Sequence, residues 1–181
     1  DESCVTVDDV PRVADRTAIQ YRLLNRSKGP AVRSPRAQCD RRAYAAAMQE
    51  VLRGQASLAL FEETAADLLV RGDEVAGVRC ESGRRLAARA VVLTTGTFLR
   101  GLLHRGEDAW PGGRLGEPPA GALSASLERL GLRLGRLKTG TPPRVDGRTL
   151  DYAVLQEQRS DADPVRFAFD APDGPVEDGV S

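Results

Sequence analysis

Histidine is nearly absent from this sequence: His104 is the only one among 181 residues. A single histidine argues against a Ser/His/Asp triad and against the zinc sites that histidines commonly help to form. The sequence also has no Walker motif, and no G-x-G-x-x-G motif follows a predicted strand. Hydrolytic triad, zinc and P-loop chemistry are therefore poor interpretations, and we expect His104 to be structural.

Aromatic residues and cysteines are scarce as well. Four phenylalanines, three tyrosines and one tryptophan offer few surfaces for stacking bases, which disfavours an autonomous single-strand nucleic-acid binder. Cys4, Cys39 and Cys80 lack metal-ligand spacing, and their odd number fits a reduced, cytoplasmic setting. No apolar run approaches the ~20 residues that span a bilayer, so we expect no membrane association.

Positive charge is concentrated in one segment of a neutral chain. The 26 basic residues balance 26 acidic ones, and only Lys28 and Lys138 are lysines. Both lysines lie in motifs that contain glycine and proline. Residues 24–42 hold six cations and one acid, Asp40. Such a cluster predicts either an anion-binding site or a solvated basic face.

A strand followed by a helix is expected around this basic segment. Residues 19–24 alternate well enough for a short strand. Ser34 can cap a helix whose first residue is Pro35 and which stops at Gly54. Its apolar face would contain Tyr44, Ala47, Met48, Val51 and Leu52. An anion among Lys28, Gly29, Arg33 and this helix N-terminus would offset the unfavourable placement of cations there. The alternative is a solvated face with Asp40 paired locally.

Strand patterns dominate residues 58–97. The turn signals at 71–74 and 81–84 predict hairpins. The apolar run at 90–96 is typical of a buried parallel strand, and its end at Thr95-Gly96 is typical of a ligand crevice.

Beyond residue 105 the chain becomes rich in glycine and proline. We expect a loop at 110–122 and then a short helix with Leu123, Leu127 and Leu130 on one face. An alternating strand should follow this helix, and then a turn-rich loop at 138–149. Residues 150–181 carry eight acids and two arginines, which predicts a surface segment or part of a second domain.

Four motifs resemble the MnmG (GidA) family of FAD-dependent tRNA-modifying enzymes. They are LLNRSKGPAVRSPRAQCDR (23–41), AVVLTTGTFLRG (90–101), GGRLGEPP (112–119) and GRLKTGTPPRVDGRTLDY (135–152). The resemblance runs from about Ile19 to Phe169. It implies an α/β fold: part of a glutathione-reductase-type (Rossmann-like) FAD-binding domain with a hairpin-rich sheet in 1–110, and a linker with part of an inserted second domain in 111–181.

The resemblance also implies site residues. FAD contacts would fall at Ala65, Ala120, Thr95 and Gly96, where glycine permits a close backbone approach. The candidates for meeting an anionic substrate or cofactor are Lys28, Arg33, Arg36, Arg41, Lys138 and Arg144. The family's Gly-rich FAD turn, its two functional cysteines and its NADH region would lie outside this sequence. We therefore expect a fragment that binds FAD poorly by itself.

The implied activity is the addition of an aminomethyl or carboxymethylaminomethyl group at C5 of the wobble uridine of tRNA. Methylene-tetrahydrofolate would supply the carbon, FAD the redox step and NADH its regeneration. The GTPase MnmE would be the partner of an MnmG homodimer within a heterotetramer. Two alternatives remain: a TrmFO-like folate-dependent tRNA methyltransferase, which the block SKGPAVRSPRAQ disfavours, and a non-catalytic RNA-binding or scaffold fragment.

Overall fold

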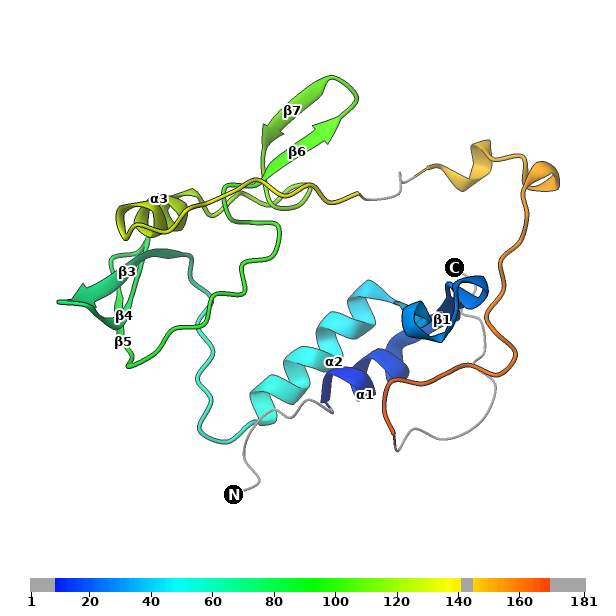
Figure 1. Ribbon diagram of the computed structural model, residues 1–181, viewed down its shortest axis with the longest axis horizontal. Helices are drawn as coiled ribbons and strands as arrows, with labels where there is room; N and C mark the ends of the chain where they lie inside the picture. The colour runs from blue at the N-terminus through cyan, green and yellow to red at the C-terminus, as the bar shows by residue number, and fades with distance from the viewer. Residues whose placement is uncertain (1–8, 141–144, 170–181) are drawn as a thin grey trace. The chain divides into compact units, whose positions relative to one another are not determined.

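The computed structural model describes residues 9–140 and 145–169 of the chain (Figure 1). It is a mixed α/β structure with small antiparallel sheets, and it divides into two compact units. Unit 1 comprises residues 1–60 and 144–181, and unit 2 comprises residues 61–143. The expected domain boundary at residue 110 stays a prediction, because these units are groups of contacts within the chain.

Unit 1 contains a two-stranded hairpin and two helices, of which the first contacts both the second strand of the hairpin and the second helix. Helix α1 (Asp9–Thr17) leads into β1 (Ala18–Leu24), which pairs antiparallel with β2 (Ser34–Cys39). Helix α2 (Arg41–Gly54) follows and packs against α1. The small core of this unit contains Val13, Tyr21 and Ala47. The predicted strand at 19–24 is confirmed, as is the end of the helix at Gly54.

The predicted helix start at Ser34-Pro35 is wrong. Residues 34–39 form β2, and α2 begins at Arg41 with Asp40 as its N-cap. The Asp40 side chain accepts a hydrogen bond from the backbone N–H of Ala43 at 2.7 Å. Pro35 is tolerated in the strand because the sheet has only two strands, so a missing N–H costs no ladder bond on the outer edge.

Two short 3₁₀ turns connect the strands of the hairpin. They are η1 (Arg26–Lys28) and η2 (Pro30–Val32), separated by Gly29 at φ 94°. This positive φ suits glycine, so the Lys-Gly-Pro sequence fixes the course of the loop.

A segment distant in the sequence lies along the edge of β1 that does not pair with β2. We call residues 158–168 the strap. The Asp161 N–H donates to the Tyr21 carbonyl at 2.9 Å, and the Tyr21 N–H donates to Ser160 Oγ at 3.1 Å. Asp15 accepts from the Tyr21 hydroxyl at 2.6 Å and from the Ala168 N–H at 2.8 Å. Before the strap, the chain forms η3 (Gly147–Thr149) and η4 (Tyr152–Val154).

Unit 2 contains a three-stranded antiparallel sheet and one helix. Strands β3 (Ala65–Arg71), β4 (Glu74–Cys80) and β5 (Arg85–Ala87) lie in sequential order. The turn glycines Gly72 and Gly83 have φ of 62° and 87°, as hairpin turns of this kind require. Both predicted hairpins are therefore confirmed. Helix α3 (Gly121–Arg129) packs against β3.

Other parts of unit 2 differ from the sequence-based expectation. Residues 58–63 and 88–95 contain no strand, and Val92 of the apolar run is 85% exposed. An apolar run forms a buried strand only beside neighbouring strands, and no described segment pairs with this one. Strands β6 (Leu102–Arg105) and β7 (Asp108–Pro111) form a hairpin that was not predicted.

Helix α3 is confirmed, but its surroundings are only partly as expected. Leu123 and Leu127 are buried on its inner face, whereas Leu130 is 43% exposed. The alternating strand expected after it is wrong, because residues 131–140 carry no secondary structure. Within the described ranges, no helix combines the length and the hydropathy needed to cross a membrane.

Candidate functional site

The basic loop of unit 1, residues 25–33 between β1 and β2, contains two of the predicted anion contacts, Lys28 and Arg33. Lys28 ends η1 and Arg33 follows η2, and both side chains are exposed. The Arg33 guanidinium donates to the Arg26 carbonyl from Nε at 3.3 Å and from Nη2 at 3.2 Å. This acceptor is neutral, so it orients the Arg33 guanidinium and leaves its charge available to an anion.

Arg26, in contrast, is neutralised within the unit. Its Nη2 lies 2.6 Å from Asp161 Oδ2, and the same carboxylate accepts the Leu23 N–H at 2.6 Å. The Leu23 N–H bond, and then Arg26, hold the pKa of Asp161 below its ordinary value. Asp161 therefore stays ionised and fixes one end of the basic loop.

The N-terminus of α2 is not the anion site that the sequence predicted. Lys28, Gly29 and Arg33 lie in the hairpin loop, and the six residues of β2 separate them from the helix. The first turn of α2 already has an anionic cap, the Asp40 carboxylate. Lys28 and Arg33 therefore do not lie at a helix N-terminus, and the helix dipole gives no reason to expect an anion beside them.

The remaining predicted cations occupy separate elements. Arg36 lies on the exposed face of β2, and Arg41 is the first residue of α2. Lys138 lies in the irregular segment after α3, in unit 2. Arg144 falls outside the described residues.

Three of the four predicted cofactor positions meet in one corner of unit 2. Thr95 and Gly96 begin a turn in which the Phe98 N–H donates to the Thr95 carbonyl at 3.1 Å. The Phe98 carbonyl accepts the Ala120 N–H at 2.8 Å, which joins this turn to the start of α3. Gly96 has φ 55°, and the space beside its Cα is open. The fourth position, Ala65, begins β3, the strand that α3 covers.

Glycines let the two segments of this corner approach closely. A Cβ on Gly113 would overlap the ring of Phe98, and one on Gly101 would overlap the Thr97 and Gly112 carbonyls. The Thr97 hydroxyl donates to the Gly113 carbonyl at 2.8 Å. The motifs TTGTFLRG and PGGRLG are thus two sides of one packed corner.

The start of α3 has unused polar groups. Ala120 occupies the N-cap position and provides no side-chain acceptor for the first turn of the helix. The Ser124 hydroxyl is buried and has no hydrogen-bond partner among the described residues. The uncapped first turn of α3 and the open space at Gly96 fit the edge of a polar ligand such as a nucleotide cofactor.

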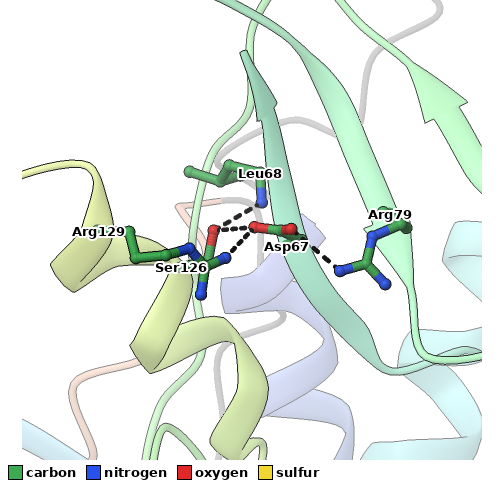
Figure 2. A network of polar contacts seen from close by, with 5 residues as sticks. All are labelled: Asp67, Leu68, Arg79, Ser126 and Arg129. Atoms are coloured by element: carbon green, nitrogen blue, oxygen red, sulfur yellow. Dashed lines mark hydrogen bonds and ion pairs between the residues drawn. The ribbon is translucent and has the colours of Figure 1, made fainter.

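A network of polar contacts holds α3 on the sheet (Figure 2). Asp67 of β3 accepts from the Ser126 hydroxyl and pairs with Arg79 at 3.0 Å and Arg129 at 2.9 Å. Ser126 Oγ in turn accepts the Leu68 N–H at 3.0 Å. The Ser126 hydrogen bond, and then Arg79, keep the pKa of Asp67 below its ordinary value. The network fixes the helix whose N-terminus borders the corner described above.

Sequence reasoning missed several residues that position these sites. The spacing T-G-T-F-L-R-G and P-G-G-R was noted, but the packing of Gly101 and Gly113 was not predicted. The glycines themselves were an available signal, because a glycine often marks a close approach of two segments. Asp161 carried no local signal, because its partner Leu23 lies 138 residues away.

Comparison with known proteins assigns the chain to a family. The model of the family described as glucose inhibited division protein A matches residues 8–177. The chain therefore belongs to the GidA family, as the resemblance indicated.

Curated relatives within this family are tRNA uridine 5-carboxymethylaminomethyl modification enzymes, MnmG. The chain is 52% identical to the one from Syntrophotalea carbinolica over 162 residues, which is 90% of this chain and 26% of that protein. It is 49% identical to the one from Chlorobium phaeovibrioides, over 89% of this chain and 26% of that protein. The chain thus spans about a quarter of the length of these relatives.

Solved structures agree with this assignment. GidA of Aquifex aeolicus superposes with a TM-score of 0.79 at 41% identity, covering 90% of this chain and 28% of that one. The GidA-related protein of Thermus thermophilus gives a TM-score of 0.51 at 25% identity, covering 70% of this chain and 64% of that one.

Proposed function

We propose that this chain is part of an enzyme that modifies the wobble uridine of tRNA with a 5-carboxymethylaminomethyl or aminomethyl group. The observation that carries the proposal is the 52% identity to an MnmG enzyme over 90% of the chain. At such identity the backbone and the arrangement of motifs are shared. The long motif 23–41, including its cations, lies within the matched region.

FAD is the cofactor of the proposed enzyme, within a Rossmann-like domain to which this chain contributes one portion. Thr95, Gly96 and Ala120 would border the cofactor, since backbone hydrogen bonds through Phe98 bring them together in one corner of unit 2. Ala65 would contribute its backbone. When bound, FAD supplies the redox chemistry of the reaction. The chain's own contribution is to bind and orient: open space at Gly96 admits a close approach, and the Asp67 network holds α3 in place.

The remaining parts of the proposal extend the family resemblance. Methylene-tetrahydrofolate is the one-carbon donor, and NADH, bound outside this chain, regenerates the reduced flavin. The GTPase MnmE is the partner of an MnmG homodimer, and the complex works in the cytoplasm. Lys28, Arg33, Arg36, Arg41, Lys138 and Arg144 are the candidate contacts to tRNA or cofactor phosphate.

The experiment uses a protein of full family length that contains this chain. It should purify with flavin absorbance and restore the modified wobble nucleoside to tRNA from a strain that lacks MnmG, measured by mass spectrometry of digested tRNA. This chain alone should bind FAD poorly, since the pyrophosphate-binding turn that the family uses is absent from its sequence. A methyl group at another uridine would favour the TrmFO-like alternative, and tRNA binding without modification would favour a scaffold.

A further inference from the structure

Two arginines stand opposite each other on the β1–β2 hairpin. Arg22 and Arg36 are Cα partners in this antiparallel pair. Side chains at such positions project from the same face of a sheet, with Cβ atoms about 4.5–5.5 Å apart, and like charges placed there repel. The sequence therefore tolerates an unfavourable pair where one residue of opposite charge would be stabilising.

The neighbouring pairs on this face carry no acid. Gln20 is the partner of Gln38, and Leu24 is the partner of Ser34. Along β2 the residues alternate, with Ser34, Arg36 and Gln38 exposed and the intervening residues half-buried. We name Gln20, Arg22, Ser34, Arg36 and Gln38 the arginine face. The side chain of each of these five residues can donate a hydrogen bond.

Acidic groups of the described chain do not neutralise the arginine face. Within residues 9–140 and 145–169, the Arg36 side chain makes no hydrogen bond or ion pair. Arg22 donates through Nη1 to the Arg159 carbonyl at 3.3 Å, a neutral acceptor. Asp161 lies within the electrostatic influence of Arg22, but its contacts are with Arg26 and the Leu23 N–H. Two guanidinium charges thus remain on one small face.

The strap holds one side of this face in place. Gln20 Nε2 donates to the Gln158 carbonyl, and Arg22 donates to the next carbonyl along, that of Arg159. Both side chains are therefore oriented before any ligand arrives, which lowers the entropy lost on binding. Positions two apart on β2 are separated by about 7 Å, so its donors form an extended row and not a single pocket.

We propose that the arginine face binds the phosphodiester backbone of the RNA substrate, with one phosphate bridging Arg22 and Arg36. This inference rests on the proposed function, because RNA is the polyanion that such an enzyme must hold. A phosphate between the two guanidinium groups converts their repulsion into two charge-assisted hydrogen bonds. Ser34 and Gln38 donate to oxygens further along the same strand of RNA.

The test measures tRNA affinity of Arg36→Gln and Arg22→Gln in a protein of full family length that contains this chain. Each variant should bind tRNA about tenfold more weakly. Binding should also depend less steeply on salt. The magnitude of the slope of the logarithm of the tRNA association constant against log salt should decrease by about 0.7–0.9 for each lost phosphate contact. The loss should be equal for substrate and non-substrate tRNA, because phosphate contacts do not read sequence. Arg53→Gln removes the same charge from an exposed arginine of α2 and should bind like the parent.

A thermal readout separates binding from folding. Arg36→Gln relieves the repulsion and breaks no side-chain contact of the described residues, so this variant should melt at or above the parent temperature. Weaker tRNA binding accompanied by a clear fall in melting temperature would assign the pair a structural role and overturn the proposal. Loss of FAD with unchanged tRNA affinity would assign the phosphate to the cofactor and overturn the RNA assignment.

The behaviour of the parent protein separates an error about the arginine face from an error about the proposed function. If the parent binds and modifies tRNA while both variants match it in affinity and salt slope, only the arginine face is wrong. If the parent binds no tRNA, the proposed function fails and the arginine face fails with it.

Discussion

The carboxylate of Asp161 accepts a hydrogen bond from the backbone N–H of Leu23 at 2.6 Å, although 138 positions separate the two residues in the sequence. The same oxygen forms the ion pair with Arg26. One side chain of the strap thus satisfies an edge donor of β1 and anchors the first cation of the basic loop. Unit 1 is held together by this contact as well as by its apolar core.

Asp161→Asn should destabilise unit 1 by about 1.5–3 kcal/mol at pH 7, since it weakens a charge-assisted bond and removes an ion pair. The native pKa lies below the ordinary value, so the carboxylate stabilises the fold above the unfolded pKa of about 3.9. This stability is lost as the pH falls through the native pKa. The difference in unfolding free energy between parent and variant should therefore be constant above about pH 5 and should shrink below about pH 4.

Urea unfolding followed by circular dichroism at several pH values checks this prediction. Asp163→Asn is the matched control, because Asp163 is an exposed neighbour on the same strap. A gap that does not narrow as the pH falls below the unfolded pKa of about 3.9 would show that the charge of Asp161 is not what stabilises the edge.

Asp67→Asn should destabilise unit 2 by about 1–2 kcal/mol, a value reduced for the partial exposure of its ion pairs. Ser126→Ala should cost a similar amount, because it leaves the Leu68 N–H without its acceptor. The two changes should be non-additive by at least about 0.5 kcal/mol, since they break one network. Denaturant titration of both single variants and the double variant measures this coupling, and Asp73→Asn in the exposed β3–β4 turn provides the control. Simple additivity would contradict the network.

Gly113→Ala should destabilise unit 2 by about 1–3 kcal/mol, because the new Cβ overlaps the Phe98 ring and forces the two segments apart. In a protein of full family length, the same change should reduce FAD retention, since Phe98 links Thr95 to Ala120. The ratio of flavin to protein absorbance and the thermal midpoint are the measurements. Gly135→Ala, where a Cβ meets nothing, should leave both unchanged.

Lys28→Ala should weaken the binding of an anionic ligand, tRNA or cofactor, by roughly 1.5–3 kcal/mol without altering stability, if it meets phosphate as proposed. Arg33→Ala should weaken binding similarly and should also loosen the loop, because it removes two bonds to the Arg26 carbonyl. Affinity for tRNA, FAD retention and modification rate are measured separately in the full-length context. Parent-like values in all three for both variants would identify the loop as a solvated face.

Local signals in the sequence predicted the local elements of this fold. The turns at 71–74 and 81–84 gave the β3–β4–β5 order because hairpin turns depend on a few adjacent residues. The apolar face of α2 was equally readable, but its start was misplaced by six residues, since Ser34-Pro35 and Asp40 both resemble caps. Only pairing with β1 distinguishes these two starts.

Features that depend on distant partners were not predictable. The strap has no periodicity, and its contacts with Tyr21 and Asp15 arise only when both ends of unit 1 meet. Residues 90–96 have the apolar pattern of a buried strand, but such a strand forms only beside a pairing strand, and the pattern does not show whether one is present. Lys28, Gly29 and Arg33 were expected to form one anion site with the N-terminus of the following helix, but β2 separates this loop from α2.

The strap also bears on the order of events during synthesis. Residues 18–39 leave the ribosome long before residue 161, so the growing chain carries a two-stranded hairpin with one edge unprotected while all of unit 2 is being made. Exposed edges of this kind pair with other chains. Unit 2 is closed by contacts within residues 61–143 and can complete itself in that interval. The vulnerable period of the nascent protein therefore ends only when the strap emerges and covers the free edge of β1.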